Sequence, residues 1–97
     1  MSKILIIDDE KAIRNTLREI LEYESYQVDE AANGEEGLEK LEVGEYAAVL
    51  CDIKMPKMDG VEVLEAIKKI KPVIPFVMIS GHGDLDTAVN TMRLGAF

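Results

Sequence analysis

Two stretches of the sequence decide the fold: KILIIDDE at residues 3–10 and AAVLCD at residues 47–52. Each contains a short, unbroken apolar run that ends in acidic side chains. An apolar run without polar alternation is typical of a strand buried on both faces of a parallel sheet. We therefore expect both segments to be central strands, with their acids at the carboxyl ends.

Helical and extended patterns alternate along the whole chain, which predicts an α/β fold with right-handed crossovers and a parallel sheet covered by helices on both faces. The expected strands are 4–7, about 27–31, 47–51 and 76–79. The expected helices carry apolar residues at helical spacing, namely Ile13, Leu17, Ile20 and Leu21; Leu38 and Leu41; Val61, Leu64, Ile67 and Ile70; and Ala88, Val89 and Met92. Asn33-Gly34 is a turn signal, and Gly44, Pro72 and Gly95 mark helix ends.

Composition and charge limit the possible functions. The 97 residues, 47% hydrophobic and 31% charged, fit one soluble globular domain. Nineteen acidic residues against eleven basic ones give a net charge of −8, which disfavours direct binding to nucleic acid or to anionic membranes. No apolar run approaches the ~18 residues of a membrane span, and no signal-peptide pattern is present, so we expect a cytoplasmic location. The single cysteine, Cys51, excludes an internal disulfide.

Polar side chains at the ends of the expected strands are candidates for a functional site. Asp8 and Asp9 follow the first strand, Asp52 the third and Ser80 the fourth. If these strands are neighbours, the four groups face one cleft, because the carboxyl ends of parallel strands meet at one edge of a sheet. Each Asp could instead be an ordinary wet strand end or a helix cap. Cys51 points to the opposite face from Asp52, where core packing is expected.

Clustered carboxylates need an explanation, because two of them about 4 Å apart repel by about 4 kcal/mol at an effective dielectric near 20. Either a raised pKa or a bound cation offsets that cost. Carboxylate oxygens without His or Cys beside them suit Mg²⁺ better than zinc. Such a site, with a further carboxylate free to attack, is typical of a phosphoryl acceptor.

Three blocks of the chain resemble the bacterial response-regulator receiver domain. They are KILIIDDE at 3–10, DIKMPKMDG at 52–60 and SGHG at 80–83, and the resemblance spans Lys3 to Phe97. It implies a flavodoxin-like three-layer sandwich with strand order 2-1-3-4-5. The stretch from Ser80 to Val89 is similar to receivers of the nitrogen-regulation type.

The resemblance also implies a role for each matching residue. Asp52 would be the phosphoryl acceptor, and Ser80 the switch hydroxyl that turns toward the acquired phosphoryl group. Mg²⁺, for which Mn²⁺ can substitute, would be bound directly by Asp9 and Asp52, by Asp8 through water, and by the backbone carbonyl of Lys54. A sensor histidine kinase or a phosphotransfer protein would donate the phosphoryl group. The output would be transcriptional, as in receivers that precede an ATPase module working with an alternative sigma factor. Such a domain modifies only itself and is not an enzyme acting on external substrates.

One departure from the family concerns the carboxyl-terminal unit. A receiver continues with a fifth strand, which ends in a lysine, and a fifth helix; residues 1–97 would thus be a receiver truncated before that unit. The strand at 76–79 would then form a sheet edge, through which self-association is expected. Two other functions stay open: a degenerate or truncated receiver that serves only for dimerisation or docking, and a small Mg²⁺-dependent phosphohydrolase.

Overall fold

The computed structural model describes residues 2–53 and 55–79. The strands are β1 (Lys3–Ile7), β2 (Gln27–Ala31), β3 (Ala48–Asp52) and β4 (Phe76–Ile79), and the helices are α1 (Lys11–Tyr23), α2 (Gly34–Val43) and α3 (Gly60–Ile70). The strand order is β2-β1-β3-β4, and every pairing is parallel. The predicted class, element order and strand order are thus confirmed over this range, whereas the expected helix with Ala88, Val89 and Met92 lies outside the described residues.

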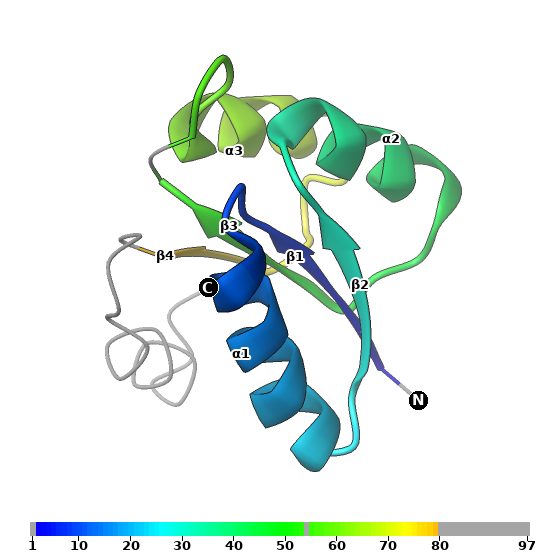
Figure 1. The fold of residues 1–97 in the computed structure, drawn as a ribbon. Coiled ribbons are helices and arrows are strands. Elements are labelled where there is room, and N and C mark those ends of the chain that lie inside the picture. The colour runs from blue at the N-terminus through cyan, green and yellow to red at the C-terminus, as the bar shows by residue number, and fades with distance from the viewer. Residues whose placement is uncertain (1, 54, 80–97) are drawn as a thin grey trace.

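Helices cover both faces of the sheet, as a three-layer fold requires (Figure 1). On one face, Leu17 and Leu21 of α1 pack against alternate residues of the strands, among them Ile4, Ile6 and Leu50. Ile20, part of the same predicted stripe, stays 38% exposed. The α1 layer is therefore built on one narrow apolar stripe.

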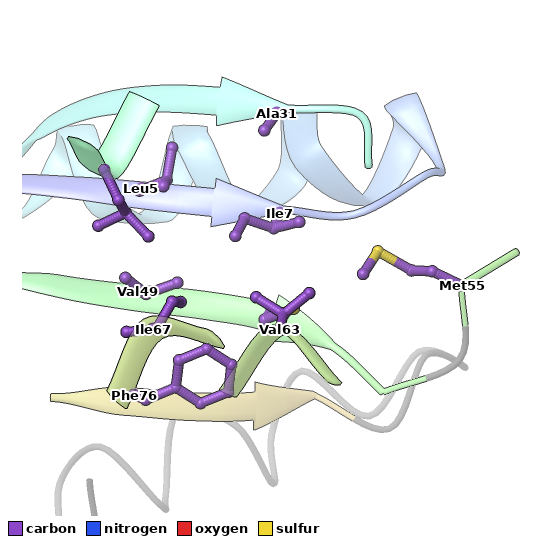
Figure 2. Packing of buried hydrophobic residues seen from close by; sticks show 10 residues of the cluster. Leu5, Ile7, Ala31, Val49, Met55, Val63, Ile67 and Phe76 are labelled. Atoms are coloured by element: carbon purple, nitrogen blue, oxygen red, sulfur yellow. The ribbon is translucent and has the colours of Figure 1, made fainter. Parts of the chain in front are cut away.

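The opposite face carries α2 and α3. Leu5, Ile7 and Val49 point toward this face and pack with Leu41 of α2, while Val63 and Ile67 of α3 close the layer (Figure 2). Burying each such side chain stabilises the fold by roughly 1.5–3 kcal/mol. Because neighbouring residues on a strand point to opposite faces, both cores come from unbroken apolar runs, which explains why the central strands show no polar alternation.

The predicted apolar stripe of α3 is confirmed at Ile67 but was wrong in including Val61 and in omitting Val63. Val63 and Ile67 are the buried pair, whereas Val61 is 46% exposed and Leu64 only packs at the margin of the core. The start of the helix fixes which of its residues face the core. Asp59 caps α3 by accepting from the Glu62 N–H at 2.9 Å, and Glu62 accepts in return from the Asp59 N–H at 3.3 Å.

Asn33-Gly34, predicted as a turn signal, marks the start of α2. Asn33 is the N-cap of α2, with its side-chain oxygen accepting from the Glu36 N–H at 2.8 Å, and Gly34 is the first helical residue. A Cβ on Gly34 would lie 2.7 Å from Cγ2 of Val63, so the glycine permits the close approach of α2 to α3.

Within the described range, β4 pairs with β3 and lies at the sheet edge. Self-association through this edge stays a prediction. No helix in the described part of the chain is long and apolar enough to cross a membrane.

Candidate functional site

Acidic side chains gather where β1 and β3 end. Ile7 pairs with Cys51 across these strands, so Asp8 and Asp52 follow at the same level of the sheet. Ligand oxygens of Asp8, Asp9 and Asp52 all lie within 4.8 Å of one another. Asp8 and Asp52 are 0% and 2% exposed, whereas Asp9 is exposed. The convergence expected from the sequence is therefore present for these residues.

Asp8 is the most constrained member of the cluster. Its N–H donates to the Ala31 carbonyl at 3.1 Å, and its Oδ1 accepts from the Glu10 N–H at 2.8 Å. Its Oδ2 is buried and accepts no hydrogen bond from the described residues. A buried carboxylate oxygen without a donor is costly, which points to a ligand that this oxygen meets when the site is filled.

Burial raises the pKa of Asp8 from 3.8 to about 6. The hydrogen bond from Glu10 acts in the opposite direction, and the negative charges of Asp52 and Asp9 add to the rise. The site is therefore electrostatically unfavourable when its carboxylates are all ionised, and a cation would relieve it.

The start of α3 lies close against the end of β3, where Asp52 is located. It is the last residue of β3 and pairs with Ile79, so the strand runs one residue further than the apolar run that predicted it. The Gly60 N–H donates to the Ile53 carbonyl at 2.9 Å, and a Cβ on Gly60 would lie 2.6 Å from the Asp52 carbonyl oxygen. Glycine at this position therefore allows the loop after β3 to fold back closely on the strand end.

The residue types in the cluster fit a hard divalent cation. The ligand atoms are carboxylate oxygens, and one of them lacks a hydrogen-bond donor among the described residues. Cys51 belongs to the core on the α2–α3 face, and burial raises the pKa of its thiol to about 12, so it offers no thiolate. This donor set matches the preference of Mg²⁺ for one or two carboxylates with remaining positions left to water and phosphate oxygens.

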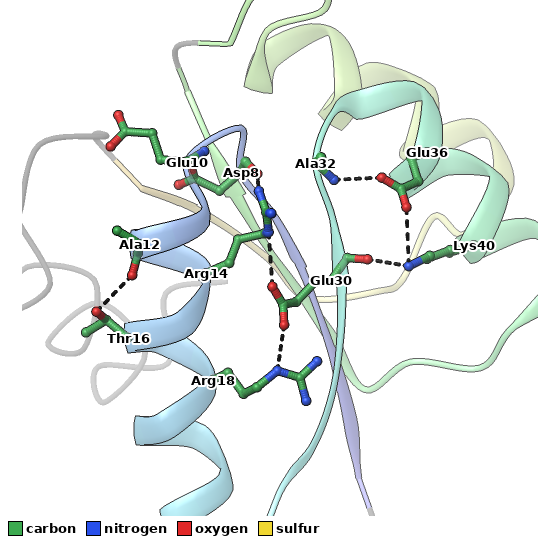
Figure 3. A network of polar contacts seen from close by, with 10 residues as sticks. All are labelled: Asp8, Glu10, Ala12, Arg14, Thr16, Arg18, Glu30, Ala32, Glu36 and Lys40. Atoms are coloured by element: carbon green, nitrogen blue, oxygen red, sulfur yellow. Dashed lines mark hydrogen bonds and ion pairs between the residues drawn. The ribbon is translucent and has the colours of Figure 1, made fainter.

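The two other predicted site residues, Ser80 and Lys54, lie outside the described residues. The core packing predicted for Cys51 is confirmed, and Met55 is buried in the same core cluster. Sequence reasoning missed Arg14, whose Nη1 donates to the Asp8 carbonyl oxygen at 2.6 Å (Figure 3). Only its place on the first turns of the helix after Asp9 hinted at this contact.

Comparison with known proteins identifies the family. The family model described as the response regulator receiver domain matches residues 4–97. An NtrX-like response regulator of Rickettsia bellii is 43% identical over 96 residues, which are 97% of this chain and 20% of the relative. The transcriptional regulatory protein ZraR of Klebsiella oxytoca is 39% identical over 93 residues, 96% of this chain and 21% of the relative. The chain thus spans about a fifth of the length of these curated relatives.

Solved structures agree with the observed fold. The response regulator TrrA of Thermotoga maritima, solved with Mg²⁺ and BeF, is similar with a TM-score of 0.81 and 37% identity, over 95% of this chain and 80% of that one. A complex of the histidine kinase ThkA with TrrA contains a similar chain, with a TM-score of 0.75 and 34% identity, over 95% of this chain and 98% of that one. The β2-β1-β3-β4 sheet, the acids at its carboxyl edge and these matches together show that the chain belongs to the receiver-domain family of two-component response regulators.

Proposed function

We propose that this receiver domain is a phosphorylation switch in which Asp52 accepts the phosphoryl group. The observation that carries the proposal is the convergence of Asp8, Asp9 and Asp52 within 4.8 Å at the carboxyl edge of the sheet. Mg²⁺, or Mn²⁺ in its place, would be held by these carboxylates and by the Lys54 backbone carbonyl. When bound, the ion neutralises charge on the phosphoryl oxygens.

Asp52 is the acceptor because of its place in the fold. It ends β3, which pairs with both β1 and β4, and it is followed by a loop at the carboxyl edge of the sheet. A carboxylate oxygen of Asp52 attacks the phosphorus of the donor and forms an acyl phosphate. The bond from phosphorus to the donor breaks, and its electron pair leaves with the donor.

The proposal also includes a phosphoryl donor and an output. We infer that a sensor histidine kinase or a phosphotransfer protein is the donor, which is supported by the similarity to TrrA, solved as a complex with the kinase ThkA. The added charge of about −1.5 to −2 would draw in Ser80 and switch the surface after β4. Relatives such as ZraR are transcriptional regulators, which supports a transcriptional output. We further infer that this output works through an ATPase module and an alternative sigma factor. The domain would act only on its own modification, in the cytoplasm.

A small acyl-phosphate donor with Mg²⁺ tests this function on the chain itself. We expect a single adduct on Asp52, located by mass spectrometry after borohydride reduction. Asp52→Asn should form none, while Asp29→Asn, a matched change of an acid on β2, should react like the parent.

Other outcomes separate the alternatives. An adduct on Asp8 or His82 would contradict the assignment of Asp52. No reaction at all would favour the dimerisation or docking module. Continuing phosphate release without a stable adduct would favour the phosphohydrolase.

A further inference from the structure

The loop between β1 and α1 is held by a side chain to which the proposed function gives no role. Nη1 of Arg14 donates to the backbone oxygen of Asp8 at 2.6 Å (Figure 3). This carbonyl belongs to the peptide group that joins Asp8 to Asp9, and a peptide group is planar. The hydrogen bond therefore restrains the orientation of both acidic residues at once.

Arg14 is itself fixed by an ion pair. Its Nε donates to Oε1 of Glu30 at 3.0 Å, and the two side chains are only 14% and 23% exposed. Glu30 lies on β2, where it pairs in register with Ile6 of β1. Charge-assisted hydrogen bonds in a partly shielded setting are stronger than exposed ones, so this pair aims the guanidinium at the loop.

Glu30 is anchored from two more directions. Its Oε2 accepts from Nε of Arg18 at 2.6 Å, and its backbone carbonyl accepts from Nζ of Lys40. Lys40 also pairs with Glu36 at 3.5 Å, so the network joins α1, β2 and α2 (Figure 3). These contacts hold Glu30 in place, and Glu30 in turn orients Arg14 toward the acidic site.

We propose that Arg14, oriented by Glu30, is a positioning residue for the cation site. It holds the Asp8–Asp9 peptide so that both carboxylates meet the ion together with Asp52. A guanidinium is a cation and cannot be a ligand, so its effect runs through the backbone carbonyl that it binds. The inference rests on the proposed function, because the ion concerned is the Mg²⁺ of that site.

Arg18 provides a matched control. Both arginines project from α1, four residues apart, and both donate to Glu30, through opposite carboxylate oxygens. Arg14 also bonds the Asp8 carbonyl oxygen, whereas Arg18 bonds Glu22 of its own helix. Neutralising Arg18 therefore removes a comparable ion pair without touching the site, which separates positioning of the acids from general support of the fold.

The test is calorimetric titration of the whole 97-residue chain with Mg²⁺. We expect Arg14→Gln to weaken Mg²⁺ binding about 10-fold, the scale of an outer residue that orients metal ligands. Arg18→Gln should stay within about 2-fold of the parent, since its ion pair is partly exposed. Arg14→Lys should fall between them, because one ammonium cannot serve both acceptors in the geometry of the guanidinium fork. Before Mg²⁺ is added, the amide NMR signals of Asp9 and Glu10 should shift in Arg14→Gln and not in Arg18→Gln.

The outcomes distinguish this inference from the function on which it rests. Parent-like affinity in Arg14→Gln would overturn the inference alone, and so would an equal loss in Arg18→Gln. If Arg14→Gln does not melt cooperatively, Arg14→Lys decides by the same comparison, with parent-like affinity overturning the inference. No Mg²⁺ binding by the parent would overturn the proposed function and this inference with it.

Discussion

Two groups of acids lie next to strand β1, and the surroundings of their carboxylates differ. On β2, Glu30 lies between Arg14 and Arg18, while Asp29 accepts from the Tyr46 hydroxyl at 2.6 Å. At the carboxyl edge of the sheet, Asp8 and Asp52 are buried beside each other and beside Asp9. The first group is neutralised by the protein, and the second accumulates like charge.

The pKa values follow this difference. The hydrogen bond from Tyr46 lowers the pKa of Asp29. Desolvation alone would raise the pKa of Glu30, but hydrogen bonds from Arg18 and Arg14 outweigh it, so this pKa is also lowered. Burial instead raises the pKa of Asp8 to about 6. The comparison teaches that the acids of β2 are paired with basic or hydroxyl groups of the chain, whereas Asp8 lies among other acids and keeps one buried oxygen without a donor among the described residues.

The largest expected effect concerns folding stability in the absence of divalent cations. The rise in the pKa of Asp8 from 3.8 to about 6 corresponds to a cost on the order of 3 kcal/mol when the group is ionised. Because the folded state binds the proton more tightly than the unfolded state, this cost is absent below pH 3.8 and grows until the pH passes about 6. We therefore expect Asp8→Asn to unfold at higher denaturant concentration than the parent at pH 7, with the gain disappearing near pH 4.

Glu30→Gln should give the opposite pH dependence. The lowered pKa of Glu30 contributes stability that is present above its ordinary value of 4.5 and is lost as the pH falls. Urea unfolding of the parent and both variants between pH 4 and pH 7, with a chelator present, measures both slopes. A destabilised Asp8→Asn at pH 7 would show that Asp8 belongs with the paired acids.

A smaller effect is expected on cation affinity. Asp9→Ala removes a carboxylate from the cluster, and we expect Mg²⁺ binding to weaken at least about 10-fold, since so few protein ligands are available. Asp29→Asn removes a charge of the same sign from the adjacent strand and should leave the affinity unchanged. Amide shifts in an NMR titration with Mg²⁺ give both dissociation constants. Parent-like binding by Asp9→Ala would mean that the assigned site is wrong.

The smallest effect concerns the hydroxyl that pairs with Asp29. Tyr46→Phe removes the donor of the 2.6 Å hydrogen bond but keeps the ring, which packs at the margin of the core beside Lys3. We expect about 1 kcal/mol less stability at pH 7, a normal value for a partly exposed hydrogen bond. The loss should shrink as acid protonates Asp29, and Mg²⁺ binding should not change. A change in Mg²⁺ affinity would mean that the two acidic groups are coupled.

The central strands were predictable because they are buried on both faces. Such strands are apolar along their buried length, so the runs ILII at 4–7 and AVLC at 48–51 are recognisable without any knowledge of their neighbours. The choice between Val61 and Val63 as a core residue of α3 was not predictable in this way. Val61 and Val63 have the same hydrophobicity, and the choice between them depends on where the Asp59–Glu62 capping box starts the helix against β3.

The acids of the site were predictable for a related reason. A carboxylate directly after a buried strand must lie at its carboxyl end, so Asp8, Asp9 and Asp52 were named from the chain alone. Arg14 and Glu30 could not be named, because they are 16 residues apart and meet only when β2 pairs with β1 and α1 packs across them.

The sequence by itself determined the class of fold, the order of elements and the acids at the strand ends, since each of these follows from local apolar pattern and strand polarity. Tertiary structure decided which acids have partners. Glu30 is paired with two arginines, whereas Asp8 carries a buried oxygen without a donor among the described residues. This difference depends on which strands and helices become neighbours. Charge interactions act over a few ångströms in space rather than along the chain, so the electrostatic character of each acid is a property of the fold.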